Sequence, residues 1–73
     1  MADVKIKTEV AGRVCSIPAA VGASVSDGEE IAFVEAMKME IPVTSTATGK
    51  LKSMLVKVDD MLSEGQVVAV IET

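Results

Sequence analysis

The stretch Glu35-Ala36-Met37-Lys38-Met39-Glu40 lies near the middle of the 73-residue chain, between two runs of alternating apolar residues. The first run ends at Val34 and the second begins at Ile41. Alternation with a period of two is typical of strands that bury one face. The pattern therefore predicts a β-hairpin with a very short turn, in which Met37 and Lys38 form the tip.

The two residues at this tip are poor choices for a hairpin turn. Two-residue hairpin turns favour positive φ, which is why Asn-Gly and Asp-Gly predominate in them. Met37 and Lys38 gain nothing from such a backbone, and sequences depart from local rules mainly at functional sites. Lys38 is therefore a candidate functional residue. The alternative is an ordinary solvated lysine beside methionines that fill the edge of the core.

The two halves of the chain repeat one pattern when the sequence is shifted by 37 residues. Gly12 falls over Gly49, Gly28 falls over Gly65, and apolar positions align between them. Each half then supplies about four short strands, and neither half buries its apolar face alone. We expect an all-β fold of two four-stranded antiparallel sheets, packed face to face with quasi-two-fold symmetry. The expected strands are 4–8, 12–17, 24–25, 30–35, 40–44, 49–56, 61–62 and 66–72.

The repeat also makes two local predictions. Pro42 falls inside the expected strand 40–44, and because proline cannot donate to a ladder, this strand should either lie at a sheet edge there or start irregularly. A two-fold exchange of the halves carries the region of Lys38 onto the region of the chain ends. Met1 and Thr73 should then be neighbours, at the end of the molecule away from Lys38.

Composition argues against several classes of function. The net charge is −4, no basic cluster is visible, and Trp and Tyr are absent, so we expect no nucleic-acid partner. No apolar run approaches the ~20 residues of a membrane helix, and no signal peptide is visible. A single domain, 1–73, in the cytoplasm is the resulting expectation. With no histidine and one cysteine, Cys15, which is interpreted as a strand residue, we expect neither a metal site nor catalytic residues.

Ala36-Met37-Lys38-Met39-Glu40 resembles the attachment sequence of biotinyl domains, the family that includes biotin carboxyl carrier proteins. Lys38 also lies at the spacing from the C-terminus that this family uses. The resemblance implies a flattened barrel or hammerhead, the barrel-sandwich hybrid. It further implies that Lys38 carries biotin in amide linkage. Ligase and partner recognition would fall to its neighbours, namely Glu35, Ala36, Met37, Met39 and Glu40.

The same resemblance implies three partners: a biotin protein ligase, a biotin carboxylase and a carboxyltransferase. The protein would carry a carboxyl group between the last two, for delivery to an acyl-CoA or a 2-oxo acid, without a catalytic site of its own. Some biotinyl domains have a protruding loop in the first half. Here 16–25 matches 53–62 in length, so there is no room for that loop. The biotin arm is therefore expected to be more exposed than in the looped members.

Two alternatives belong to other functional classes. Lipoyl domains of 2-oxo acid dehydrogenase-type complexes share this architecture, but their lysine typically lies in Asp-Lys-Ala, and here Met37 and Met39 flank it. An unmodified domain used only for protein contacts is the second alternative. It predicts no covalent addition and no consequence of replacing Lys38.

Overall fold

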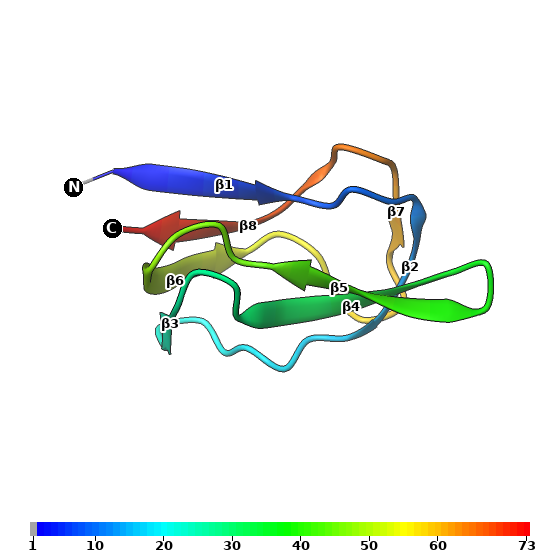
Figure 1. The fold of residues 1–73 in the computed structure, drawn as a ribbon, viewed down its shortest axis with the longest axis horizontal. Helices are drawn as coiled ribbons and strands as arrows, with labels where there is room; N and C mark the ends of the chain where they lie inside the picture. Colours follow the sequence, from blue (N-terminus) through cyan, green and yellow to red (C-terminus); the bar gives the residue numbers. More distant parts are fainter. Residues whose placement is uncertain (1) are drawn as a thin grey trace.

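The computed structural model describes residues 2–73, which form eight strands arranged in two antiparallel sheets (Figure 1). We call one sheet the terminal sheet, because it contains the first and last strands, and the other the hairpin sheet, because it contains the β4–β5 hairpin. The terminal sheet has the order β1 (Asp3–Lys7), β8 (Val67–Glu72), β6 (Gly49–Met54) and β3 (Ser24–Val25). The hairpin sheet has the order β5 (Met39–Thr44), β4 (Glu30–Ala36), β2 (Gly12–Ser16) and β7 (Met61–Leu62). The all-β fold of two four-stranded sheets is thus confirmed.

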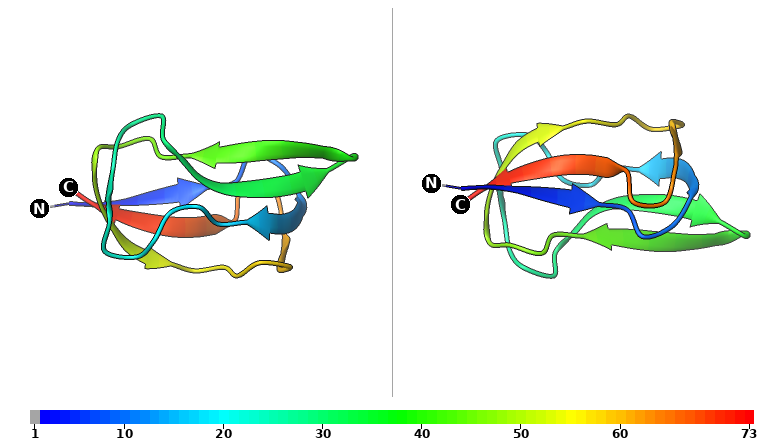
Figure 2. Two further views of the ribbon diagram at one scale, coloured as in Figure 1. Left: turned by 90° about the horizontal axis from the view of Figure 1, so that it is seen from below. Right: turned by 90° about the horizontal axis from the view of Figure 1, so that it is seen from above.

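The quasi-two-fold symmetry extends to the strand order. A shift of 37 residues converts β1, β2, β3 and β4 into β5, β6, β7 and β8, and so converts the order of one sheet into that of the other. Each sheet therefore contains strands from both halves of the chain, and neither half forms a sheet by itself. Figure 2 shows the two layers and the connections that cross between them at both ends.

The observed strands match the expected ones within one or two residues, and the differences have local causes. The first strand ends at Lys7 and not at the predicted Thr8, which is buried and whose N–H still donates to the Gln66 carbonyl at 3.0 Å. Its hydroxyl donates to the Val10 carbonyl at 2.8 Å and accepts from the Val10 N–H at 3.2 Å. Ser45, aligned with Thr8 in the repeat, makes the same pair of bonds with Ala47. Both buried hydroxyls are thereby satisfied, as burial requires.

The core between the sheets is built from small aliphatic side chains, many of them β-branched residues that suit strands. Val34 and Ile71 illustrate the pattern: each is fully buried and they occupy aligned positions of the repeat. Pro42 lies in β5, at the edge of the hairpin sheet, as predicted for a residue that cannot donate to a ladder. The buried apolar residues are Ile6, Val14, Val25, Ile31, Ala32, Val34, Val43, Leu51, Val56, Leu62, Val68, Ala69 and Ile71.

The chain ends and the β4–β5 hairpin lie at opposite ends of the longest axis, which is 36 Å long (Figures 1 and 2). Thr73 donates its N–H to the Ala2 carbonyl at 2.9 Å, so the strands that begin and end the chain remain paired to their last described residues. Met1 lies outside the described residues. The ends that the structure does describe, Ala2 and Thr73, lie together and away from Lys38.

Two glycines lie so close to the backbone of a neighbouring strand that there is no room for a side chain. A Cβ on Gly12 would collide with the Glu35 carbonyl oxygen and would lie 2.8 Å from Val34 Cγ1. A Cβ on Gly49 would collide in the same way with the Glu72 carbonyl oxygen. Because those carbonyls belong to strand backbones, they cannot move aside without disturbing the ladder.

We predict that Gly12→Ala and Gly49→Ala each lower the free energy of unfolding by about 1–3 kcal/mol, the usual cost of forcing an extra methyl group into packed structure. Chemical denaturation monitored by circular dichroism measures this change. Ala20→Ser, which adds one atom to an exposed loop residue, is the control and should leave stability unchanged. Equal stability of all three variants would contradict the close approach.

Candidate functional site

The candidate site is the tip of the β4–β5 hairpin. The strands keep one register from Ala32 to the tip, where Ala36 pairs with Met39, so Met37 and Lys38 form the two-residue turn that the sequence predicted. Their φ angles are 52° and 64°. Both lie in the left-handed region, which short hairpins require and which non-glycine residues adopt at a cost.

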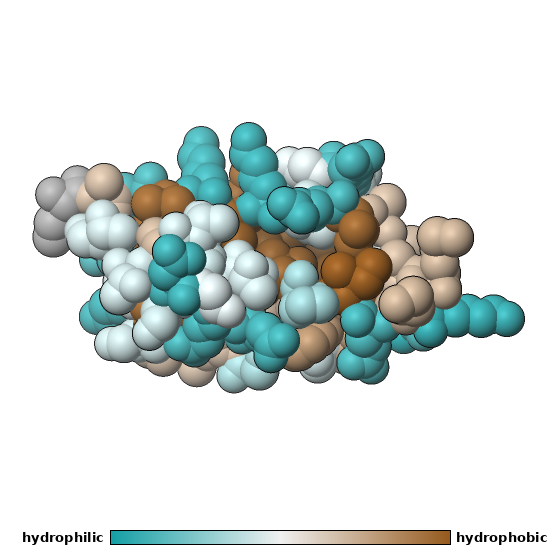
Figure 3. All heavy atoms as spheres, in the orientation of Figure 1, coloured by the Kyte–Doolittle hydropathy of each residue, from teal (hydrophilic) through white to brown (hydrophobic). Residues whose placement is uncertain are grey.

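The side chains at the tip are open to solvent. Met37 is 95% exposed and Met39 is 65% exposed, although both are large apolar residues. Lys38 is exposed as well, and within residues 2–73 it has no ion-pair partner. Figure 3 shows apolar atoms gathered at the end of the molecule that carries this hairpin. The fold thus holds a free amine between two exposed thioethers at the far end of a paired ribbon.

Glu35 is held by the fold on the outer face of the hairpin sheet. Arg13 donates to Glu35 at 3.0 Å and also binds the Asp59 carboxylate. The pKa of Arg13 is raised, first by its hydrogen bond to Glu35 and then by that to Asp59. The arginine thereby connects β2, β4 and the loop before β7. Glu40 pairs with Glu35 across the ladder and is exposed.

The sequence interpretation missed the Arg13–Asp59 contact, although the repeat carried a signal for it. Asp59 aligns with Gly22, and both adopt positive φ, 79° and 92°. A non-glycine residue in the left-handed region is uncommon and calls for a compensating contact. The ion pair with Arg13 is that contact, and the corresponding glycine in the other half needs none.

The other missed feature is a groove on the inner face of the hairpin. Ala36, Met39 and Ile41 point to this face, where the hairpin extends past the terminal sheet. Opposite them lie residues of the connection between β1 and β2, which no sequence pattern marked as part of a site. The groove is lined by Glu9, Val10, Ala11, Ala36, Met37, Met39, Ile41 and Glu64.

The chemistry of the tip suits covalent modification of an amine. The paired strands hold the backbone of Lys38, so an enzyme that binds the tip meets the amine at a defined position. No group of three or more potential metal ligands occurs among the residues that the structure describes. Residues 2–73 also contain no helix long and apolar enough to cross a membrane. The exposed lysine fits an amide-linked prosthetic group, because such a group needs an accessible primary amine.

Comparison with known proteins agrees with this geometry. The family model for biotin and lipoyl attachment, described as "Biotin-requiring enzyme", matches residues 4–71. The "Biotin/lipoyl attachment protein" of Bacillus subtilis is 32% identical over 62 residues, which cover 85% of each chain. A component of the 2-oxoglutarate dehydrogenase complex of Schizosaccharomyces pombe, named a probable dihydrolipoyllysine-residue succinyltransferase, is 46% identical over 52 residues. These residues make up 71% of this chain and 12% of that protein.

Among solved structures, the urea carboxylase of Kluyveromyces lactis has a region that superposes with a TM-score of 0.93 at 38% identity. The match covers 99% of this chain and 6% of that enzyme. The chain is therefore similar to one small region of that large enzyme, and it spans most of the length of the Bacillus subtilis attachment protein.

The strained turn yields a prediction about stability. Met37→Asn should raise the free energy of unfolding by about 0.5–1 kcal/mol, because asparagine tolerates positive φ and the nearly fully exposed methionine loses few contacts. Met39→Asn is the matched control, since Met39 lies in the extended strand and gains nothing from the change. Urea denaturation of both variants measures the difference. A less stable Met37→Asn variant would show that the methionine side chain itself supports the turn.

The Arg13 contacts yield a second prediction. Arg13→Gln should speed hydrogen exchange at the amides of Asp59 and Asp60, which bond to Val14 and Lys57 carbonyls. We expect about a two- to fivefold change at low salt and less at high salt, because the ion pairs are exposed and screened. Lys50→Gln is the control: Lys50 aligns with Arg13 in the repeat but forms no ion pair within residues 2–73. Unchanged exchange in the Arg13 variant would mean that backbone bonds alone hold this loop.

Proposed function

The chain belongs to the biotin/lipoyl attachment domain family, and from this premise we propose that it is a covalent biotin carrier acylated on Lys38. The observation that carries the proposal is the tip itself. A solvent-exposed lysine lies between two exposed methionines, on a two-residue turn whose left-handed backbone suits neither residue. The turn contributes no apolar burial, so presenting the amine is the best reason for this sequence at the tip.

Each neighbour of Lys38 has a distinct part in the proposal. Met37 and Met39 offer slim, adaptable apolar surface to a biotin protein ligase and to later partners. Ala36, with its small side chain, leaves space beside them on the inner face of the hairpin. Glu40 adds a negative charge near the amine. Glu35 acts by a different route, since its bond to Arg13 ties the end of β4 beside the tip to β2.

When bound, biotin supplies a ring nitrogen that accepts a carboxyl group at a biotin carboxylase and releases it at a carboxyltransferase. The role of this chain is to hold and transport that ring. The lysine side chain and the biotin pentanoyl chain together span about ten single bonds, so their reach is on the order of 12 Å. Tethering keeps the ring at high effective concentration near both partners. Acyl-CoA and 2-oxo acids are the proposed classes of final acceptor.

A lipoyl carrier is the second candidate, and one specific observation favours it. The relative from Schizosaccharomyces pombe, whose name denotes a dihydrolipoyllysine residue, is 46% identical over 52 residues. Against it stands the Met-Lys-Met sequence, which resembles biotinyl rather than lipoyl attachment sites. The third candidate is a domain that carries no group and serves only as a protein contact.

Intact mass distinguishes these three candidates. After co-expression with a biotin ligase, or isolation from the native host, the chain should be heavier by about 226 Da, the mass that one biotinyl amide adds. A lipoyl amide would add about 188 Da, and the unmodified domain would show no addition. The net charge should move from −4 to about −5, because amidation removes one cation.

Lys38→Arg should abolish the added mass and the streptavidin signal, because arginine keeps the charge but offers no acylable amine. Lys50→Arg, at an exposed lysine of β6 in the terminal sheet, is the matched control and should be labelled fully. Persistent labelling of the Lys38 variant would assign the acceptor to another lysine and remove the proposed site.

A further inference from the structure

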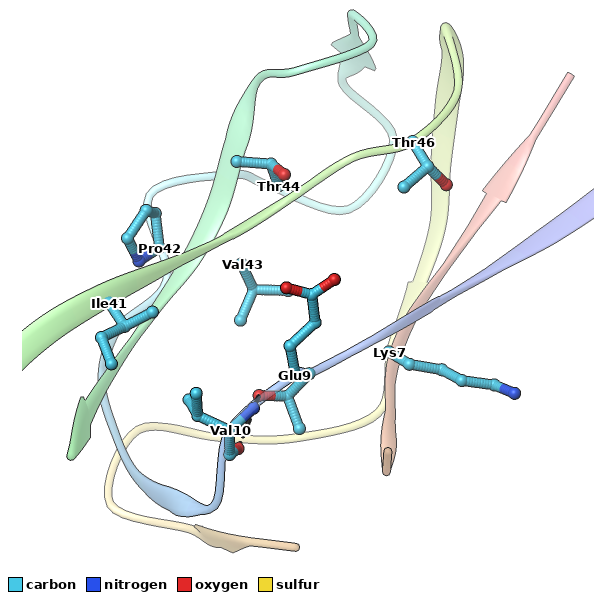
Figure 4. Close-up of a pocket in the computed structure, with 9 residues that line it drawn as sticks. Lys7, Glu9, Val10, Ile41, Pro42, Val43, Thr44 and Thr46 are labelled. Carbon is cyan, nitrogen blue, oxygen red and sulfur yellow. Dashed lines mark hydrogen bonds between the residues drawn. The ribbon is translucent and has the colours of Figure 1, made fainter. Parts of the chain in front are cut away.

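The groove beside the hairpin adjoins a second hollow farther from the tip. The two share Glu9, Val10 and Ile41, and the second extends along β5 to Thr44 and Thr46. Figure 4 shows the Glu9 side chain reaching across this hollow toward Val43, while Lys7 points away from it. An open channel therefore runs from the base of the tip along the inner edge of β5, with a carboxylate in its path.

The end of this channel beside the tip has larger apolar side chains than the aligned positions in the other half of the fold. The shift of 37 residues aligns three of its apolar residues with smaller apolar residues near the chain ends. The symmetry of the fold does not require this difference, so the larger side chains are specific to the end of the molecule that bears the amine. The aligned pairs are Met39 with Ala2, Ile41 with Val4, and Val10 with Ala47.

We propose that this channel is a resting site for the acylated arm of Lys38, in which the biotinyl group lies back along β5 when no partner enzyme holds it. The inference rests on the proposed function and adds a binding surface to it. The absence of a protruding loop predicted an arm without contacts to its own domain. The channel supplies such contacts from a different part of the fold, the connection between β1 and β2.

The length of the arm matches the channel. Its reach is on the order of 12 Å, and a strand rises by about 3.4 Å per residue. An arm that folds back from Lys38 along β5 therefore reaches the level of Ile41, three residues on. Val10 and Glu9 line both parts of the channel together with Ile41.

The chemistry of the channel also matches biotin. The pentanoyl chain and the thioether ring are apolar and meet Ala36, Met39, Ile41 and Val10. The ureido group carries two N–H donors, and Glu9 and Glu64 line the groove with carboxylates that accept hydrogen bonds. A lipoyl group has the apolar chain but no N–H donor beyond its linking amide, so the two carboxylates would add nothing for it.

The test begins with intact mass, so that the state of the arm is known. The full chain, labelled with ¹³C and ¹⁵N and carrying unlabelled biotin, is then compared with the unmodified chain by NMR. We expect isotope-filtered NOEs from biotin protons to the methyl groups of Val10 and Ile41. Amide shifts should change along the channel, and not only at Met37, Lys38 and Met39.

A capture rate gives an independent measurement. An arm that rests on the domain part of the time is less available, so streptavidin should bind the modified chain about two- to fivefold more slowly than a variant with a blocked channel. Ala11→Trp fills the groove from an exposed position. The double variant Glu9→Gln, Glu64→Gln weakens the polar contacts without altering shape. Both should speed capture and reduce the NOEs, whereas Ala20→Trp in another exposed loop should change neither.

The possible results separate the two proposals. Full addition of about 226 Da with shifts confined to the tip, or capture unaffected by Ala11→Trp, overturns the resting site and leaves the carrier intact. No added mass overturns both proposals, since no arm exists. If Ala11→Trp slows biotinylation while no biotin contacts are seen in the channel, the groove is a ligase contact and the resting site is wrong.

Discussion

The whole structure depends on one burial constraint, which is that neither half of the chain can cover its own apolar face. Each half supplies strands to both sheets, so the core forms only when the halves interlock. The side chains that fill it are small and aliphatic, and they leave room for close strand pairs. Gly12 and Gly49 allow those close approaches at aligned positions. The result is a body stiff enough to support a hairpin that projects beyond it.

The backbone at the tip adopts a conformation that its residues do not favour. Met37 and Lys38 adopt left-handed conformations that asparagine or glycine would adopt at lower cost. The pairing of β4 with β5, which continues up to Ala36 and Met39, forces the turn to close in two residues. The fold therefore sets the backbone, and the side chains at the tip are free to serve a partner. Local strain and full exposure of apolar side chains occur together at the one place where an external function explains both.

Most of the fold was predictable because its signals are local or repeated. Alternation around Val34 and Ile41 predicted the two strands of the hairpin. The aligned glycines predicted the quasi-two-fold symmetry, and Pro42 indicated a sheet edge. The Arg13–Asp59 contact was not predicted, because it joins residues distant in sequence and depends on how a loop returns to β2. The channel was not predicted for the same reason. Val10 and Ala11 belong to the connection between β1 and β2, and only the three-dimensional arrangement brings them opposite Met39.

Symmetry offers a way to separate scaffold from function in this chain. Where the two halves agree, as for the buried hydroxyls of Thr8 and Ser45, the shared feature serves the fold, because both halves must satisfy the same burial. Where they differ, the fold alone gives no reason. The differences gather at the hairpin end: a closed turn in place of two chain ends, an ion-paired Asp59 in place of a glycine, and larger apolar residues at Met39 and Ile41 of β5. The two halves thus share one scaffold, and the features that distinguish one half from the other lie around Lys38.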